Sequence, residues 1–160
     1  NYDLPFLARH CDVFYIGGTK VGAMFGEAVV FSGMKTPKYF FTNVKRHGAL
    51  LAKGRMLGIQ FDTLFTDNLY FKVSRHAIAM SERIRSIFCK HGIDIAYDSP
   101  TNQQFVILSP TLYEKLSQKV AFEIWERKSE TEIICRFVTS WATREEELEE
   151  LDEILQNILS

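Results

Sequence analysis

Two short apolar runs on either side of a glycine-rich segment place the strongest constraint on how this chain can fold. Residues 13–16 (VFYI) and 28–31 (AVVF) are rich in strand-forming side chains and carry no polar residue. Such continuous runs are typical of strands buried on both faces. Glycines occupy positions 17, 18, 22 and 26 between the runs, where they permit tight turns and close approach of backbone to a ligand. The pattern predicts buried strands joined by a glycine-rich turn.

Apolar residues at three- and four-residue steps predict two helices after these strands. One covers residues 43–65, and the next ends at Gly92, because glycine commonly terminates helices. The inner stripe of the second helix is expected to contain five residues: Ala77, Met80, Ile84, Ile87 and Phe88.

The pattern changes in the second half of the chain. Strands are predicted at 93–97 and 105–108, a short helix at 111–119 after Ser109-Pro110, and a hairpin from 120–127 and 132–139. A capping box of Thr143 and Glu146 opens a final helix. We therefore expect an α/β chain with a smaller α+β tail. The boundary falls between about residues 67 and 92, and we place it after residue 70, giving domains 1–70 and 71–160.

Composition narrows the class of protein. The chain is 46% hydrophobic and 24% charged with a net charge of −1, which is typical of a globular protein and argues against a broad nucleic-acid surface. No apolar run is long enough to cross a membrane, and no secretory signal is visible. Three cysteines without a CxxC motif argue against a disulfide framework or a zinc site and favour a cytoplasmic setting. The four histidines show no metal spacing, so no metal is expected.

Lys20 is the first charged residue in an unexpected place. It lies in Gly17-Gly18-Thr19-Lys20-Val21-Gly22, among small and apolar residues, and the nearest acid is Glu27. We expect the ammonium to be desolvated, which favours the free amine that a Schiff-base nucleophile requires. Thr19 would place a hydroxyl near a phosphate. The alternative is a lysine that extends to solvent from a glycine-rich turn. A nucleotide phosphate loop does not fit, because the GxxxxGK[ST] order is absent.

Arg136 is the second such residue. In Ile133-Ile134-Cys135-Arg136-Phe137-Val138 both alternating faces are apolar, so the guanidinium should lie in the interior and need an anionic partner. Arginine binds a carboxylate through two parallel hydrogen bonds. A substrate carboxylate and a structural ion pair both satisfy this requirement. The polar run 99–104 lines a site mouth or forms a plain loop.

These segments resemble the low-specificity threonine aldolase family. The residues that carry the resemblance are DVFYIGGTKVGAMFGEAV at 12–29, RHGALLAKGR at 46–55, Thr101-Asn102, and RFVTSW at 136–141. This family belongs to the pyridoxal-phosphate-dependent β-eliminating lyases of the aspartate-aminotransferase-like fold. The resemblance implies the end of a large cofactor domain, with a mostly parallel sheet and helices, followed by a small α+β domain with an antiparallel hairpin.

The resemblance also implies roles for individual residues. Lys20 would form the Schiff base with pyridoxal 5'-phosphate, Thr19 and Arg46 would lie near its phosphate, and Arg136 would bind the α-carboxylate of the amino-acid substrate. The product chemistry would be cleavage of threonine or allo-threonine to glycine and acetaldehyde. Other readings are another β-eliminating lyase or an aminotransferase of the same fold, or a non-catalytic module.

The family pattern predicts that this chain is incomplete. The sequence begins Asn1-Tyr2-Asp3 without an initiator methionine and matches only the C-terminal half of the family. The ring that stacks on the cofactor, the partner of its pyridine nitrogen and the general base are expected from a missing N-terminal half. We therefore expect the chain alone to be inactive, and the complete enzyme to be a homo-oligomer, either a dimer or a tetramer.

Overall fold

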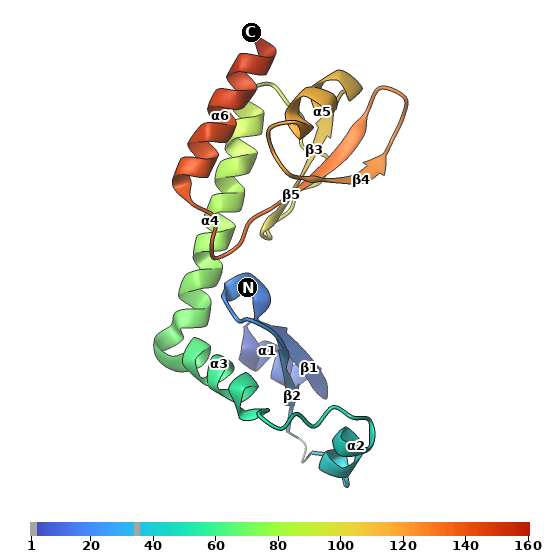
Figure 1. Ribbon diagram of the computed structural model, residues 1–160, viewed down its shortest axis with the longest axis vertical. Helices are drawn as coiled ribbons and strands as arrows, with labels where there is room; N and C mark the ends of the chain where they lie inside the picture. The colour runs from blue at the N-terminus through green and yellow to red at the C-terminus, as the bar shows by residue number, and fades with distance from the viewer. Residues whose placement is uncertain (1–2, 34–35) are drawn as a thin grey trace. The chain divides into compact units, whose positions relative to one another are not determined.

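The computed structural model describes residues 3–33 and 36–160, and the chain forms two compact units, Asn1–Tyr70 and Phe71–Ser160 (Figure 1). Both units combine helices with a small sheet. The α/β class expected from the sequence is confirmed. The assignment of the two units to a large cofactor domain and a small C-terminal domain stays a prediction.

The first unit is built on a hairpin. Helix α1 (Leu4–His10) is followed by β1 (Val13–Gly17) and β2 (Glu27–Phe31), which pair antiparallel. The strands predicted at 13–16 and 28–31 are thus confirmed, but no parallel pairing occurs among the described residues. The reason is that residues 18–26 are too few for a crossover, which needs about a dozen residues or more. Both strands also alternate in burial, whereas the sequence predicted burial on both faces.

The single helix predicted over 43–65 is wrong. The chain instead forms α2 (Phe40–Arg46) and α3 (Arg55–Phe65). Gly48 separates them with a φ of +70°, a left-handed conformation that ends a helix and that glycine adopts without strain. The apolar periodicity of this region therefore belongs to two short helices and the turn between them.

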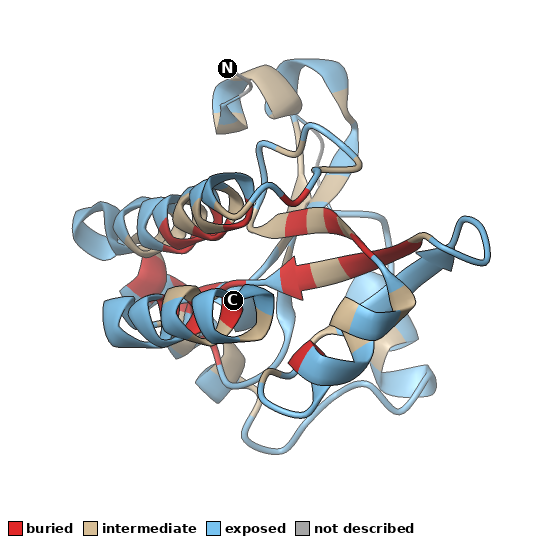
Figure 2. Ribbon diagram, turned by 90° about the horizontal axis from the view of Figure 1, so that it is seen from above, coloured by how far each residue is buried: buried red, intermediate tan, exposed pale blue. Residues whose placement is uncertain are grey.

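The second helix prediction is confirmed. Helix α4 (Leu69–Lys90) follows a short 3-10 turn, η2 (Thr66–Asn68), and stops just before Gly92, whose φ is +71°. Four of the five expected inner residues, Ala77, Met80, Ile84 and Phe88, are buried, and Ile87 is partly buried. Figure 2 shows this buried stripe on one side of α4. No helix in the described part of the chain is long and apolar enough to cross a membrane.

A three-stranded antiparallel sheet forms the centre of the second unit, in the order β3 (Gln103–Leu108), β5 (Ile133–Val138), β4 (Glu123–Arg127). Helix α5 (Pro110–Ser117) begins as predicted, because the Ser109 hydroxyl accepts from the backbone N–H of Leu112 at 3.3 Å. The predicted hairpin is confirmed. The strand predicted at 93–97 is wrong, since Ile95 makes only an isolated bridge to Val106.

The last helix, α6 (Glu145–Leu159), begins one residue later than a cap at Thr143 would require. The Arg144 backbone N–H donates to the Glu147 carboxylate at 3.0 Å. This hydrogen bond lowers the pKa of Glu147. Thr143 instead accepts from the Ser140 N–H. A capping box is therefore present as predicted, but Arg144 and Glu147 form it instead of Thr143 and Glu146.

One face of the sheet carries the hydrophobic core of the second unit. Helices α4 and α6 supply most of the remaining side chains, and Figure 2 shows the buried residues on their inward sides. The buried cluster consists of Met80, Ile84, Phe88, Ile93, Val106, Leu108, Leu116, Ile133, Cys135, Phe137, Leu148, Leu151 and Leu155.

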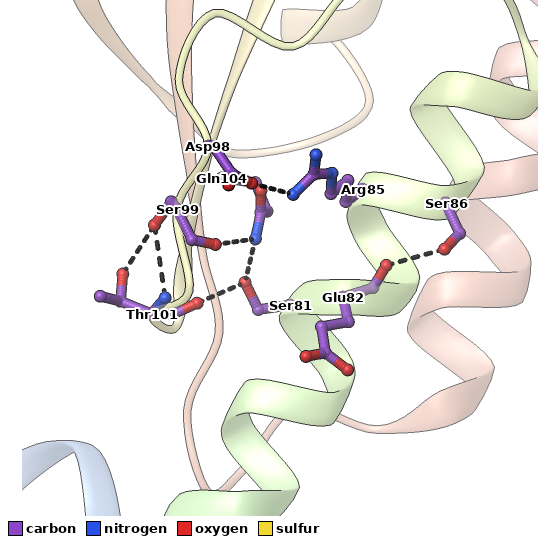
Figure 3. Close-up of polar contacts among 8 residues, drawn as sticks. All are labelled: Ser81, Glu82, Arg85, Ser86, Asp98, Ser99, Thr101 and Gln104. Atoms are coloured by element: carbon purple, nitrogen blue, oxygen red, sulfur yellow. Dashed lines mark hydrogen bonds and ion pairs between the residues drawn. The ribbon is translucent and has the colours of Figure 1, made fainter. Parts of the chain in front are cut away.

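A buried polar network ties the loop before β3 to α4 (Figure 3). The Ser81 hydroxyl donates to the Thr101 carbonyl at 3.0 Å and accepts from Gln104 Nε2 at 2.9 Å. Gln104 Nε2 also donates to the Ser99 carbonyl at 3.3 Å. Ser81 and Gln104 are almost completely buried, so each lost bond leaves a group without a partner in the interior. The Ser81 hydroxyl thus joins the loop to α4 and to β3 at one buried point.

We expect Ser81→Ala to lower the free energy of unfolding by about 1–3 kcal/mol, because the Thr101 carbonyl and one Gln104 N–H lose their buried partner. Urea denaturation followed by circular dichroism measures this change. Ser86→Ala is the matched control, since Ser86 is exposed and its hydroxyl bonds only the Glu82 carbonyl one turn earlier. Equal effects of the two substitutions would contradict the role of the network.

A surface ion pair links the end of α4 to α6 and makes stability pH-dependent. Asp152 accepts from Lys90 Nζ and from His91 Nε2, each at 2.6 Å. The bond from Lys90, and after it the bond from His91, lowers the pKa of Asp152. A lowered folded-state pKa means that the carboxylate stabilises the fold above its unfolded value of about 4. This stabilisation is lost as the pH falls through the folded-state pKa.

Asp152→Asn is therefore expected to destabilise the protein at pH 6 and to destabilise it less as the pH falls below the unfolded-state pKa of the carboxyl group. Urea midpoints at pH 6 and near pH 2 measure the difference. Glu153→Gln, which changes the next and exposed residue of α6, serves as the control for net charge. A destabilisation by Asp152→Asn that persists unchanged at low pH would show that the ion pair is not its cause.

Candidate functional site

The segment that carries Lys20 is a tight turn directly after β1. Residues Thr19–Val21 form a 3-10 turn, η1, which Gly22 ends with a φ of +97°. The Gly18 carbonyl accepts from the N–H groups of Val21 at 3.1 Å and Ala23 at 2.9 Å. These bonds fold the backbone back on itself, so the conformation of the turn does not depend on the side chains of Thr19 and Lys20.

Helix α3 holds this turn in place. The Gln60 side chain accepts from the Met24 N–H at 2.7 Å and donates to the Phe25 carbonyl at 3.3 Å. A Cβ atom at Gly18 would lie 2.6 Å from Ala23 Cβ and 3.0 Å from Phe61 Cζ. Gly18 is therefore required for the close contact between the turn and α3, rather than for a positive φ.

Tyr70 fixes the start of the turn from a second direction. Its hydroxyl donates to the Gly17 carbonyl at 3.0 Å. Burial raises the pKa of Tyr70, so the hydroxyl stays protonated and remains a donor through the neutral pH range. The backbone at Gly17 and the turn that follows it are thus supported by both α3 and Tyr70.

The side chains of Thr19 and Lys20 are exposed, and the expectation of a desolvated Lys20 is wrong for this structure. Lys20 makes no hydrogen bond or ion pair with any described residue. The apolar neighbours that suggested desolvation, Val21 and Ala23, are themselves buried and take the interior positions of the turn. Thr19 and Lys20 are left side by side at the surface.

Arg46 lies elsewhere in the first unit. It is the last residue of α2 and is exposed. Arg46, like Lys20, makes no hydrogen bond or ion pair within residues 3–33 and 36–160. The structure therefore places Thr19 and Lys20 together and gives no contact that joins them to Arg46.

Arg136 lies on β5 in the second unit, as the sequence alternation predicted. Its neighbours Cys135 and Phe137 turn into the hydrophobic core, and burial raises the pKa of Cys135 to about 11. Arg136 points to the opposite face of the sheet, where its side chain is 27% exposed. The expectation of an interior guanidinium is thus correct only in part, because the face that carries Arg136 opens toward solvent at Val138.

Three side chains of neighbouring strands contact the Arg136 guanidinium. Nη2 donates to a carboxylate oxygen of Glu123, and Nη1 donates to Gln103 Oε1 at 3.2 Å. Trp125 lies against the guanidinium, 5.3 Å from its ring centroid. The Nε–H is buried and has no acceptor among the described residues. A buried donor without a partner is unusual in folded proteins, and here it belongs to a group suited to binding a carboxylate.

Aromatic rings continue this face of the sheet beside Arg136. Trp125 packs edge-on against Phe105, with centroids 5.2 Å apart, and Phe105 against Tyr97, at 5.4 Å. The Tyr97 hydroxyl donates to Glu126 at 3.2 Å. We call the group formed by Gln103, Glu123, Trp125 and Arg136 the Arg136 cluster.

Sequence reasoning did not identify the other three members of the Arg136 cluster. Glu123 lies opposite Arg136 in the β4–β5 register, so counting back through the predicted hairpin would have paired them. The position of Trp125 could not be predicted, because it lies at a register shift between Ile124 and Glu126. The alternation of residues along the strand does not reveal this shift. The polar run 99–104 was interpreted as a loop or a site mouth; its Gln103 enters the Arg136 cluster while Gln104 braces α4.

The described residues contain no group of three His, Cys, Asp or Glu side chains that could hold a metal ion. The candidate site residues offer two other groups: the exposed amine of Lys20 on its turn, and the Arg136 guanidinium, whose buried Nε–H lacks an acceptor among the described residues.

Comparison with known proteins gives these positions a context. No family model matches the chain. A low specificity L-threonine aldolase from a Pseudomonas species is 27% identical over 150 residues, which are 93% of this chain and 42% of that protein. The corresponding protein of Pseudomonas aeruginosa is 26% identical over 141 residues, 88% of this chain and 40% of the relative.

A solved structure agrees with the sequence relatives. The threonine aldolase of Leishmania major superposes on all of this chain with a TM-score of 0.93 and 36% sequence identity, and the match covers 47% of that protein. The chain thus spans less than half the length of the relatives it matches. The resemblance inferred from the Lys20 and Arg136 segments is confirmed: in sequence and in fold, this chain is similar to the C-terminal part of threonine aldolases.

Proposed function

We propose that this chain is the C-terminal part of a pyridoxal-phosphate-dependent lyase that cleaves β-hydroxy amino acids, threonine and allo-threonine, to glycine and acetaldehyde. The observation that carries the proposal is the match to the Leishmania threonine aldolase, which extends over the whole chain at 36% identity. Both Pseudomonas relatives carry the same name, which favours this activity over another lyase or an aminotransferase of the fold.

Lys20 is the proposed attachment point for the cofactor. Its backbone is fixed by the Gly18 carbonyl, by Gln60 and by Tyr70, so the amine extends from a rigid support at the surface. Thr19 beside it, and Arg46, are the proposed partners of the phosphate. When bound, pyridoxal phosphate supplies the conjugated ring that accepts electrons from the broken bond.

Arg136 is the proposed partner of the substrate carboxylate. Its planar guanidinium can present two parallel donors to a carboxylate, and its buried Nε–H lacks an acceptor among the described residues. The residues present therefore fit an amino-acid substrate on this face of the sheet. By fixing the carboxylate, Arg136 would orient the substrate and so reduce the entropy cost of reaching the reactive geometry.

Other parts of the proposed enzyme lie outside this chain. The chain covers 40–47% of its relatives, and the general base and the ring that stacks on the cofactor are proposed to come from the N-terminal portion. Exposed apolar side chains support further contacts of the first unit: Val13, Tyr15, Met24, Phe25, Val29, Leu50, Leu51, Met56 and Ile59. We propose that the complete enzyme is a cytoplasmic homo-oligomer and that the chain alone is inactive.

Lys20→Ala, made in this chain together with the N-terminal portion, is expected to abolish the visible absorbance of lysine-bound cofactor and to reduce threonine cleavage to background. Borohydride reduction followed by peptide mapping should find the label on Lys20 in the unmodified protein. Lys53→Ala is the control, because Lys53 is another exposed lysine of the first unit. Retained absorbance and activity in the Lys20 variant would discard the assignment.

Arg136→Lys in the same enzyme is expected to raise KM for threonine by about tenfold or more, since a point charge replaces a planar pair of donors. Cofactor absorbance should not change. Steady-state kinetics with glycine and acetaldehyde as measured products tests both the role and the reaction. Arg127→Lys, on the exposed edge strand β4, is the control, and an unchanged KM in the Arg136 variant would contradict carboxylate binding.

A further inference from the structure

We propose that the Arg136 guanidinium is an anion-binding site and that Glu123 competes for it from within the chain. The Glu123 carboxylate binds the guanidinium until an incoming carboxylate displaces it. This inference rests on the proposed function for the identity of the incoming group, an amino-acid carboxylate. The competition itself depends only on the contacts within the Arg136 cluster, and it can be tested without cofactor or catalysis.

The present partners of the Arg136 guanidinium leave one of its hydrogen-bond donors without an acceptor in the described part of the chain. Gln103 accepts from Nη1 at 3.2 Å, Glu123 accepts from Nη2, and Nε–H has no acceptor. Nε and Nη2 lie on the same edge of the guanidinium plane, and a carboxylate can accept from both at once through its two oxygens. Glu123 uses only one half of this pair of donors.

An incoming carboxylate that spans Nε and Nη2 would satisfy the buried Nε–H, which Glu123 leaves unpaired. Glu123 and the incoming group require the same Nη2 donor, so they cannot bind there together. Gln103, in contrast, holds Nη1 on the other side of the guanidinium and can stay in place during the exchange. The geometry thus favours a carboxylate that accepts from both Nε and Nη2 over Glu123, and it requires Glu123 to leave when such a carboxylate binds.

The position of Glu123 makes its displacement easy. Its side chain is 68% exposed, and it lies on β4, an edge strand whose residues are all exposed. An exposed carboxylate is well solvated once it leaves its partner, so the loss of the ion pair costs little on the Glu123 side. Once displaced, Glu123 can be solvated without distortion of the sheet.

Trp125 provides a direct report of what occupies the site. Its ring lies 5.3 Å from the Arg136 guanidinium, and the bulge in β4 between Ile124 and Glu126 allows it to turn toward Arg136. The chain has one other tryptophan, Trp141. The background substitution Trp141→Phe leaves Trp125 as the sole indole, so its fluorescence reports on the Arg136 cluster alone.

The experiment titrates sodium acetate, a simple carboxylate, into the 160-residue Trp141→Phe protein, with sodium chloride holding the ionic strength constant. A saturable change in Trp125 fluorescence is expected. Glu123→Gln should lower the acetate concentration at half-saturation by about two- to fivefold, the range expected for loss of an exposed competing ion pair. Glu123→Ala should act in the same direction, and urea denaturation checks that both variants are folded.

Glu126→Gln is the matched control, since Glu126 is an exposed acid on the same strand that accepts from Tyr97 instead of Arg136. It makes the same change in net charge and should leave the acetate midpoint unchanged. Arg136→Met should remove the saturable response. Equal midpoints for the parent protein and both Glu123 variants overturn the proposal, as does equal tightening by Glu126→Gln or the absence of a saturable response.

Borohydride labelling of Lys20 by pyridoxal phosphate in the complete enzyme tests the proposed function separately. Labelling of Lys20 with no effect of Glu123→Gln on acetate binding overturns the competition alone. Tighter acetate binding by Glu123→Gln without labelling of Lys20 supports the competition and counts against the proposed function.

Discussion

Strand β5 gives the second unit two chemically different surfaces, and the properties of the Arg136 cluster follow from that division. Alternate residues of β5 enter the core between the sheet and the helices, where Cys135 is fully buried. The residues between them face away, so Arg136 has a dry, rigid support behind it and a partly open surface in front. A flexible arginine would lose much side-chain entropy on binding an anion, whereas Gln103 and Trp125 already restrain this one.

The first unit supports Lys20, the proposed attachment point for the cofactor, in a different way. The turn that carries Lys20 is held through backbone groups, by the Gly18 and Gly17 carbonyls and by the amide of Gln60. The side chains at 19 and 20 are consequently free of structural duties. Such a separation lets chemistry and stability be set by different residues, which is what a covalent attachment point requires when its side chain must be available to a ligand.

Local sequence signals predicted most of the elements and the β4–β5 hairpin, but not the other strand pairings. The Ser109-Pro110 cap, the Gly92 stop and the hairpin were readable because each depends on residues close in sequence. The break at Gly48 was missed because the apolar periodicity continues across it. The antiparallel pairing of β1 with β2 follows from their short connection, which the pattern of apolar runs does not include. The failure of residues 93–97 to form a strand is decided by tertiary contacts that periodicity does not encode. For the site, the residue types and spacing indicated Lys20 and Arg136, yet burial of Lys20 was wrongly expected because small apolar neighbours can face inward themselves.

The contact between the turn and α3 has an implication for how this chain can vary. A methyl group at position 18 would lie 2.6 Å from the one already present at Ala23, with Phe61 closing the remaining space at 3.0 Å. The two positions therefore share a single volume, just large enough for one methyl group. A side chain at position 18 would therefore have to push the turn that carries Lys20 away from α3, even if Ala23 were reduced to glycine, because Phe61 would still lie at 3.0 Å.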